Sequence, residues 1–156
     1  MKILLLQIGK TTESYLREGI SLYQKRLTNY NSFEIITIPE LKNTSAMSQE
    51  QQKIMEGKLI LEKIEHGNFV VLLDEKGKEF SSVEFSDFLE KSRSSNIKSM
   101  IFVIGGPYGF SKPVYERSNS LISLSKLTFS HQMVRLIFME QLYRAFSILR
   151  NEPYHH

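Results

Sequence analysis

The C-terminal part of the sequence places proton-handling and anion-binding side chains at helical spacing. His131 and Arg135 are four residues apart, and so are Glu140 and Arg144. Residues at this spacing share one face of a helix. A His–Arg pair that faces a substrate could handle a proton and hold negative charge, whereas the same pair on an open surface would only be solvated. Both interpretations stay open for His131 and Arg135, and Glu140 with Arg144 would suit an exposed salt bridge.

A glycine-rich turn is the second candidate for chemistry. Three of the eight glycines occur in residues 105–109, directly after an apolar run. The spacing matches neither a dinucleotide-binding loop nor a P-loop. It predicts either a tight strand-to-helix turn or a place where backbone approaches a ligand.

Residues 124–129, with the sequence LSKLTF, alternate small hydroxyls with apolar side chains. This pattern suits an adenosine-sized ligand that is held by backbone groups, and it equally suits an irregular strand end.

Composition limits the classes of protein that these groups could serve. The 156 residues contain no cysteine and four histidines, which excludes disulfides and disfavours a structural zinc site, so no metal is expected. No apolar run is long enough to span a membrane, and the opening run ends too soon for a signal peptide. We expect one domain, residues 1–156, in the cytoplasm. The net charge of +3 is concentrated at the two ends of the chain, which is where a polyanion should bind.

The hydrophobic pattern supplies the elements that must position these groups. The expected strands are residues 2–8, 33–38, 69–73, 100–104 and 121–124. The expected helices are residues 16–30, 54–64, 81–94, a short one from 111, and 132–150. Residues 42–52 are expected to form a loop and residues 74–78 a turn. This alternation predicts an α/β fold with a mainly parallel sheet flanked by helices, and ligands bind beyond the carboxyl ends of such strands.

The last expected helix is apolar on more than one face, so it should be buried on several sides. A partner subunit could cover the extra face, or the helix could lie deep in the core.

Several motifs together resemble one known family. They are GGPYG at 105–109, LSKLTF at 124–129, HQMVR at 131–135, QLYRAF at 141–146 and the terminal PYH at 153–155. In order, spacing and chain length they resemble the ribosomal large subunit methyltransferase H family, of the SPOUT class. This resemblance implies a homodimer with a C-terminal trefoil knot, which uses S-adenosylmethionine as methyl donor. The implied substrate is N3 of a pseudouridine in helix 69 of 23S rRNA, on the assembled ribosome.

The resemblance also implies roles for individual residues. The implied cofactor-binding residues are Leu73, Gly105, Leu124, Ser125, Lys126, Leu127, Thr128 and Phe129. The implied catalytic residues are the proton handlers His131, Tyr154 and His155 and the cations Arg135 and Arg144. We expect the glycines of the turn to let backbone pack closely around the knot and the cofactor. We expect the terminal segment to fold back over the cofactor cleft, with Pro153 stopping the helix before it.

Two other functions are consistent with parts of this pattern. A non-catalytic ribosome-binding module could share the scaffold, and would bind rRNA without affinity for the donor. A nucleotide-binding oxidoreductase is disfavoured, because an early glycine fingerprint is absent.

Overall fold

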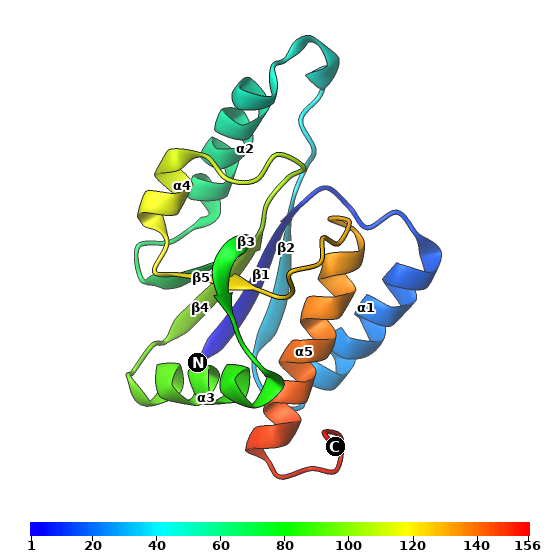
Figure 1. The fold of residues 1–156 in the computed structure, drawn as a ribbon, viewed down its shortest axis with the longest axis vertical. Helices are drawn as coiled ribbons and strands as arrows, with labels where there is room; N and C mark the ends of the chain where they lie inside the picture. Colours follow the sequence, from blue (N-terminus) through cyan, green and yellow to red (C-terminus); the bar gives the residue numbers. More distant parts are fainter.

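The computed structural model describes all residues from Met1 to His156 and is built around a five-stranded sheet. All strands are parallel, in the order β2-β1-β4-β3-β5. The strands are β1 (Lys2–Ile8), β2 (Phe33–Ile38), β3 (Asn68–Glu79), β4 (Ser99–Ile104) and β5 (Ser120–Ser123). The helices are α1 (Ser14–Leu27), the short 3-10 helix η1 (Thr44–Ala46), α2 (Gln49–Lys63), α3 (Ser82–Ser94), α4 (Lys112–Arg117) and α5 (Met133–Leu149). The predicted α/β class is therefore confirmed (Figure 1).

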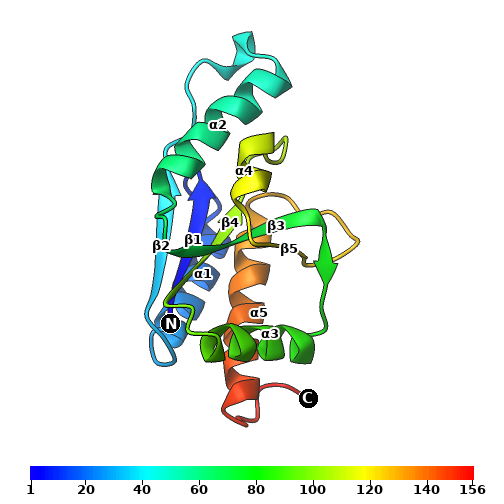
Figure 2. The same cartoon turned by 90° about the vertical axis from the view of Figure 1, so that its left-hand side faces the viewer.

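Helices cover both faces of the sheet, so the central strands are apolar on both sides. One core contains Leu27 of α1, Phe85 of α3 and Phe138 of α5, packed on one face. The other contains Ile60 of α2 and Val114 of α4 on the opposite face. Both chain termini lie toward the end of the molecule opposite α2 (Figure 2).

Local capping signals fix two helix starts, and the sequence analysis used only one of them. The expected box of Ser81 and Glu84 is present and opens α3. A second box, of Ser48 and Gln51, opens α2. The expected loop over residues 42–52 is therefore wrong at its end, because residues 49–52 are helical. The Ser48 and Gln51 side chains accept hydrogen bonds from backbone N–H groups that have no partner within the first turn of the helix.

The segment after Leu73 is an extension of β3, so the expected turn over residues 74–78 is wrong. β5 pairs with both arms of the bent strand, and Ile122 lies opposite both Leu73 and Lys78. A Cβ atom on Gly77 would lie 2.5 Å from backbone atoms of Ile122, so only glycine fits. The extension of β3 and strand β5 are therefore in close backbone contact at this point.

Helix α5 lies between α1 and α3 and against the sheet, which explains its apolar character on several sides. A Cβ atom on Gly19 would lie 2.8 Å from the Leu136 side chain, so α1 approaches α5 closely. The deep-core interpretation therefore accounts for most of the helix. Val134 and Ile137 remain only half-buried within one chain. None of the helices combines the length and the apolar character needed to cross a membrane.

Candidate functional site

A cavity of about 940 Å³ lies beside the middle of β3 and at the carboxyl ends of β4 and β5. Its lining includes every residue expected to bind a cofactor: Leu73, Gly105, Leu124, Ser125, Lys126, Leu127, Thr128 and Phe129. His131 also lines it. Residues from three separate parts of the sequence thus meet in one place, as the parallel topology predicts.

Each glycine of the turn has a different local environment. Gly109 has a φ of +78°, in the left-handed region that favours glycine. A Cβ atom on Gly105 would lie 3.0 Å from the Phe110 ring, and one on Gly106 would lie 2.2 Å from a carboxylate oxygen of Glu56. Side chains therefore crowd this turn. All three glycines line the cavity, as expected of a turn that lets backbone approach a ligand, whereas a close approach of backbone to backbone occurs at Gly77.

The loop after β5 is shaped by its own hydroxyl groups. The Ser123 hydroxyl donates to the backbone oxygen of Ser125 at 3.0 Å, and the Ser125 hydroxyl accepts from the backbone N–H of Leu127 at 2.9 Å. The Leu127 side chain is 76% exposed beside the cavity. A large apolar side chain this exposed is available to contact a ligand.

One wall of the cavity was missed by the sequence analysis. The Tyr115 hydroxyl donates to Asp74 at 2.6 Å, and both residues line the cavity. Burial, followed by this hydrogen bond to a carboxylate, raises the pKa of Tyr115 well above its usual value. The phenol therefore stays protonated and fixes Asp74 at the wall. An acidic residue directly after a buried strand was the available signal, but we had assigned it to a turn.

Arg135 does not face the cavity, which corrects both interpretations of the pair with His131. It is 1% exposed, and its guanidinium donates to the Ile8 backbone oxygen at 2.7 Å and to Thr11 at 3.0 Å. Gln132, one turn earlier, bonds Lys10 and Thr12 in the same loop. Arg135 thus ties the start of α5 to the segment after β1 and is a structural residue.

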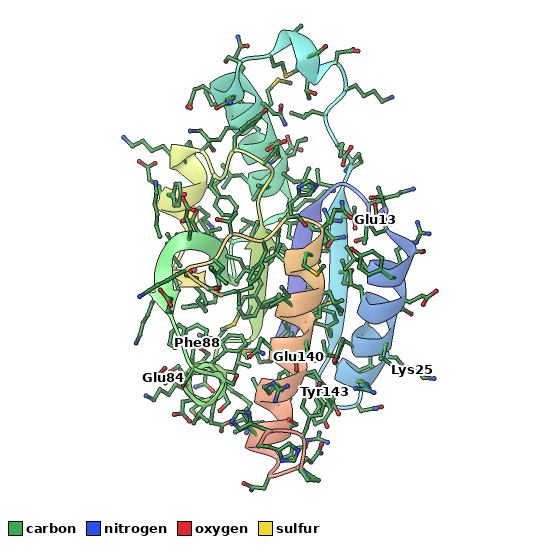
Figure 3. The ribbon with its side chains drawn as sticks, turned by 45° about the vertical axis from the view of Figure 1, so that its right-hand side comes forward. Glu13, Lys25, Glu84, Phe88, Glu140 and Tyr143 are labelled. Atoms are coloured by element: carbon green, nitrogen blue, oxygen red, sulfur yellow. The ribbon has the colours of Figure 1, made fainter.

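The other three predicted catalytic residues form a separate group, the tail cluster, consisting of Glu140, Arg144, Tyr154 and His155 with Tyr23 of α1. Arg144 donates to Glu140 at 3.0 Å, and Tyr154 donates to the same carboxylate at 3.1 Å. The Tyr23 and Tyr154 hydroxyl oxygens are 3.1 Å apart. Arg144 also lies 3.4 Å from a ring nitrogen of His155. Glu140 lies on the outer side of α5 (Figure 3).

The electrostatic environment of the tail cluster keeps Tyr154 and Arg144 protonated, so both side chains are hydrogen-bond donors. Burial, the Tyr23 hydrogen bond and the Glu140 charge raise the pKa of Tyr154 well above its usual value. The hydrogen bond to Glu140 raises the pKa of Arg144 as well. Tyr154 therefore acts as a neutral hydrogen-bond donor, and it is a poor proton acceptor.

Within one chain, the tail cluster and the cavity lie apart. Val134 lines the cavity, and Arg144 follows ten residues later on the same helix. At 1.5 Å per residue this is about 15 Å along the axis. The tail turns at Asn151, whose φ is +54°, and folds against the end of α5. Within one chain the tail therefore does not cover the cavity, and Asn151 turns the chain before Pro153 is reached.

Comparisons with known proteins agree with this architecture. Residues 1–155 match the family described as "Predicted SPOUT methyltransferase". A solved structure described as a probable methylase family protein from Haemophilus influenzae superposes with a TM-score of 0.54 at 10% identity, covering 99% of this chain and 70% of the other. The chain therefore has the fold of the SPOUT methyltransferases.

The curated relatives narrow the class further. A protein of Parabacteroides distasonis is 56% identical and one of Christiangramia forsetii is 57% identical. In each case the match covers 100% of this chain and 99% of the relative. Both are named ribosomal RNA large subunit methyltransferase H. This chain belongs to that family.

Proposed function

We propose that this protein uses S-adenosylmethionine to methylate N3 of a pseudouridine in helix 69 of 23S rRNA, on the assembled ribosome in the cytoplasm. The observation that carries the proposal is the single cavity lined by all eight expected cofactor-binding residues. The names of the relatives support large-subunit rRNA as the substrate. The resemblance described above supports the particular base.

The cavity fits the donor in size and in lining. Its volume of about 940 Å³ falls within the range of small-molecule sites. Leu73, Ile104 and Leu124 supply apolar surface for a purine, while the glycine turn and the loop after β5 expose backbone groups for its edge and the ribose. When bound, the donor supplies an activated methyl carbon on a sulfonium.

The protein must then align the attacking nitrogen and remove one proton. His131 is the proton-handling side chain of the predicted set that reaches the cavity, and it is exposed at its mouth. It can accept the N3 proton directly. Arg135 is buried against Ile8 and does not line the cavity, so we do not assign it a part in this step.

The tail cluster can serve the same reaction only if it reaches a cavity other than its own. We propose a homodimer in which the α5 helices of two copies pack across a two-fold axis. In an antiparallel pair, the C-terminal end of one α5 lies beside the N-terminal end of the other, and the same patch meets itself. Arg144, Tyr154 and His155 of one protomer would then steady the RNA at the cavity of its partner. The half-buried Val134 and Ile137 supply apolar surface for this contact.

Two measurements test the proposal. Calorimetric titration should show binding of S-adenosylmethionine and S-adenosylhomocysteine. Single-turnover assays should show methyl transfer to ribosomes that lack the modification, little transfer to protein-free 23S RNA, and none to ribosomes that already carry it. Binding of rRNA with no donor affinity would instead support a non-catalytic ribosome-binding module.

A further inference from the structure

Glu56 on α2 is a buried acidic residue placed behind the glycine turn. It is 3% exposed. A Cβ atom built on Gly106 would lie 2.2 Å from Glu56 Oε2 and 2.8 Å from Oε1, so the carboxyl group faces the α-carbon of that glycine. Gly106 itself lines the cavity. Glu56 is therefore separated from the candidate donor site by one layer of backbone.

The carboxyl group is only partly satisfied inside the protein. Oε1 accepts a hydrogen bond from Gln52 at 3.0 Å. Oε2 is buried and has no hydrogen-bond partner, and Glu56 takes part in no salt bridge. An unpaired buried carboxylate is costly, because no water solvates its charge. Groups of this kind are rare in native structures and need an explanation.

Packing alone does not explain the choice of glutamate. A glutamine has nearly the same shape, could keep the hydrogen bond to Gln52 through its own amide oxygen, and carries no charge. The surroundings of Glu56 favour its neutral form in the absence of a ligand. Burial raises its pKa, Glu40 raises it further, and only the Gln52 hydrogen bond and the charge of His131 oppose these effects. A raised pKa favours the neutral acid while no cation is nearby, whereas a sulfonium behind Gly106 would favour the carboxylate. What glutamine would lack is the ability to become negatively charged when the sulfonium is bound.

We propose that Glu56 selects the positively charged donor by its negative charge, acting on the sulfonium through the glycine turn. The inference rests on the proposed function, since it assumes a sulfonium donor in this cavity. At low dielectric, a charge several ångströms away acts without direct contact. Loss of the methyl group leaves a neutral thioether, which Glu56 no longer attracts. The same residue therefore favours entry of the donor and release of the spent product.

The test compares two ligands that differ only in the methyl group and its charge. In the Glu56→Gln variant, the Kd for S-adenosylmethionine should rise on the order of tenfold, while the Kd for S-adenosylhomocysteine changes less than about twofold. The Tm of the unligated variant should equal or exceed that of the wild type, because a buried carboxyl group with an unpaired oxygen has been replaced by a group that cannot ionise.

Glu62→Gln is the matched control, since Glu62 is an exposed residue of the same helix. It should change neither affinity. If Glu56→Gln does not fold, Glu56→Asp keeps the charge and should keep the preference for the charged ligand. Equal weakening of both ligands, or a lower Tm with both affinities unchanged, would overturn the inference and leave the proposed function standing. A wild-type protein that bound neither ligand would overturn the proposed function itself.

Discussion

The two ends of α5 hold the two candidate sites, and they are built differently. At its start, the cavity is formed by strand ends and by two loops whose backbone is exposed to a ligand. At its end, the tail cluster is formed by aromatic rings, an ion pair and a shared carboxylate: Tyr143 and Tyr154 have ring centroids 4.7 Å apart, and Arg144 lies over the Tyr154 ring. A site whose ligand contacts come from backbone groups is disrupted when a side chain is added there. A site built from side chains is disrupted when those side chains are removed. Variants at the two ends should therefore affect different steps.

The largest effect is expected at the cavity. In Gly105→Val, the added side chain would press on Phe110, whose ring is 3.0 Å from where a Cβ atom would lie. The turn must shift, so the Kd for S-adenosylhomocysteine should rise by about a hundredfold or more. Calorimetric titration measures this change. Gly67→Val is the control, because nothing lies within 4 Å of its Cβ position. Normal binding by a folded Gly105→Val protein would remove the turn from the donor site.

Deleting residues 153–156 should produce the opposite pattern. The deletion removes Tyr154 and His155 but none of the residues that line the cavity. Donor affinity should stay near the wild-type value, while the single-turnover rate on unmodified ribosomes falls by between about tenfold and a hundredfold, as expected for lost charge-assisted hydrogen bonds. A wild-type rate would exclude the tail from the reaction and leave His131 as the remaining proton handler.

Mixing these two defective chains tests whether the ends meet across a dimer. A heterodimer of the Gly105→Val chain and the tail-deleted chain has one intact cavity and one intact tail. If each active site combines the cavity of one protomer with the tail of the other, every heterodimer has one working site out of two. Random pairing makes about half of the dimers heterodimers, so co-expression should restore about a quarter of the wild-type rate. Each variant alone is the control. Failure to recover activity in isolated heterodimers would contradict a shared site.

The smallest effect on chemistry is expected at Arg135. Arg135→Met should leave the Ile8 backbone oxygen without its buried donor and lower the free energy of unfolding by about 2 kcal/mol. Urea unfolding measures this loss. At temperatures where the variant is folded, donor affinity and turnover should change little. A large loss of turnover with unchanged stability would return Arg135 to the active site.

The sequence was most informative where a local pattern and the tertiary structure agree. Strand Phe33–Ile38 and helix α3 were predicted closely, because a short apolar segment ended by a proline and a capping box are local signals. Residues 124–129 were expected to bind the cofactor because of the resemblance to a known family, and all of them line the cavity. Two errors had a common cause. Residues 74–79 continue β3 because β5 pairs with the end of this segment, and Arg135 is buried because the segment after β1 meets α5.

By itself, the sequence determined the α/β class, the family and the residues that line the cavity, because these follow from short-range periodicity and from motifs of fixed spacing. Only the tertiary structure decided which groups share a site. It separated Arg144, Tyr154 and His155 from His131, buried Arg135, and brought Glu56 behind Gly106. Such pairings join residues far apart in the chain. They depend on how helices pack across the sheet, which no local pattern encodes.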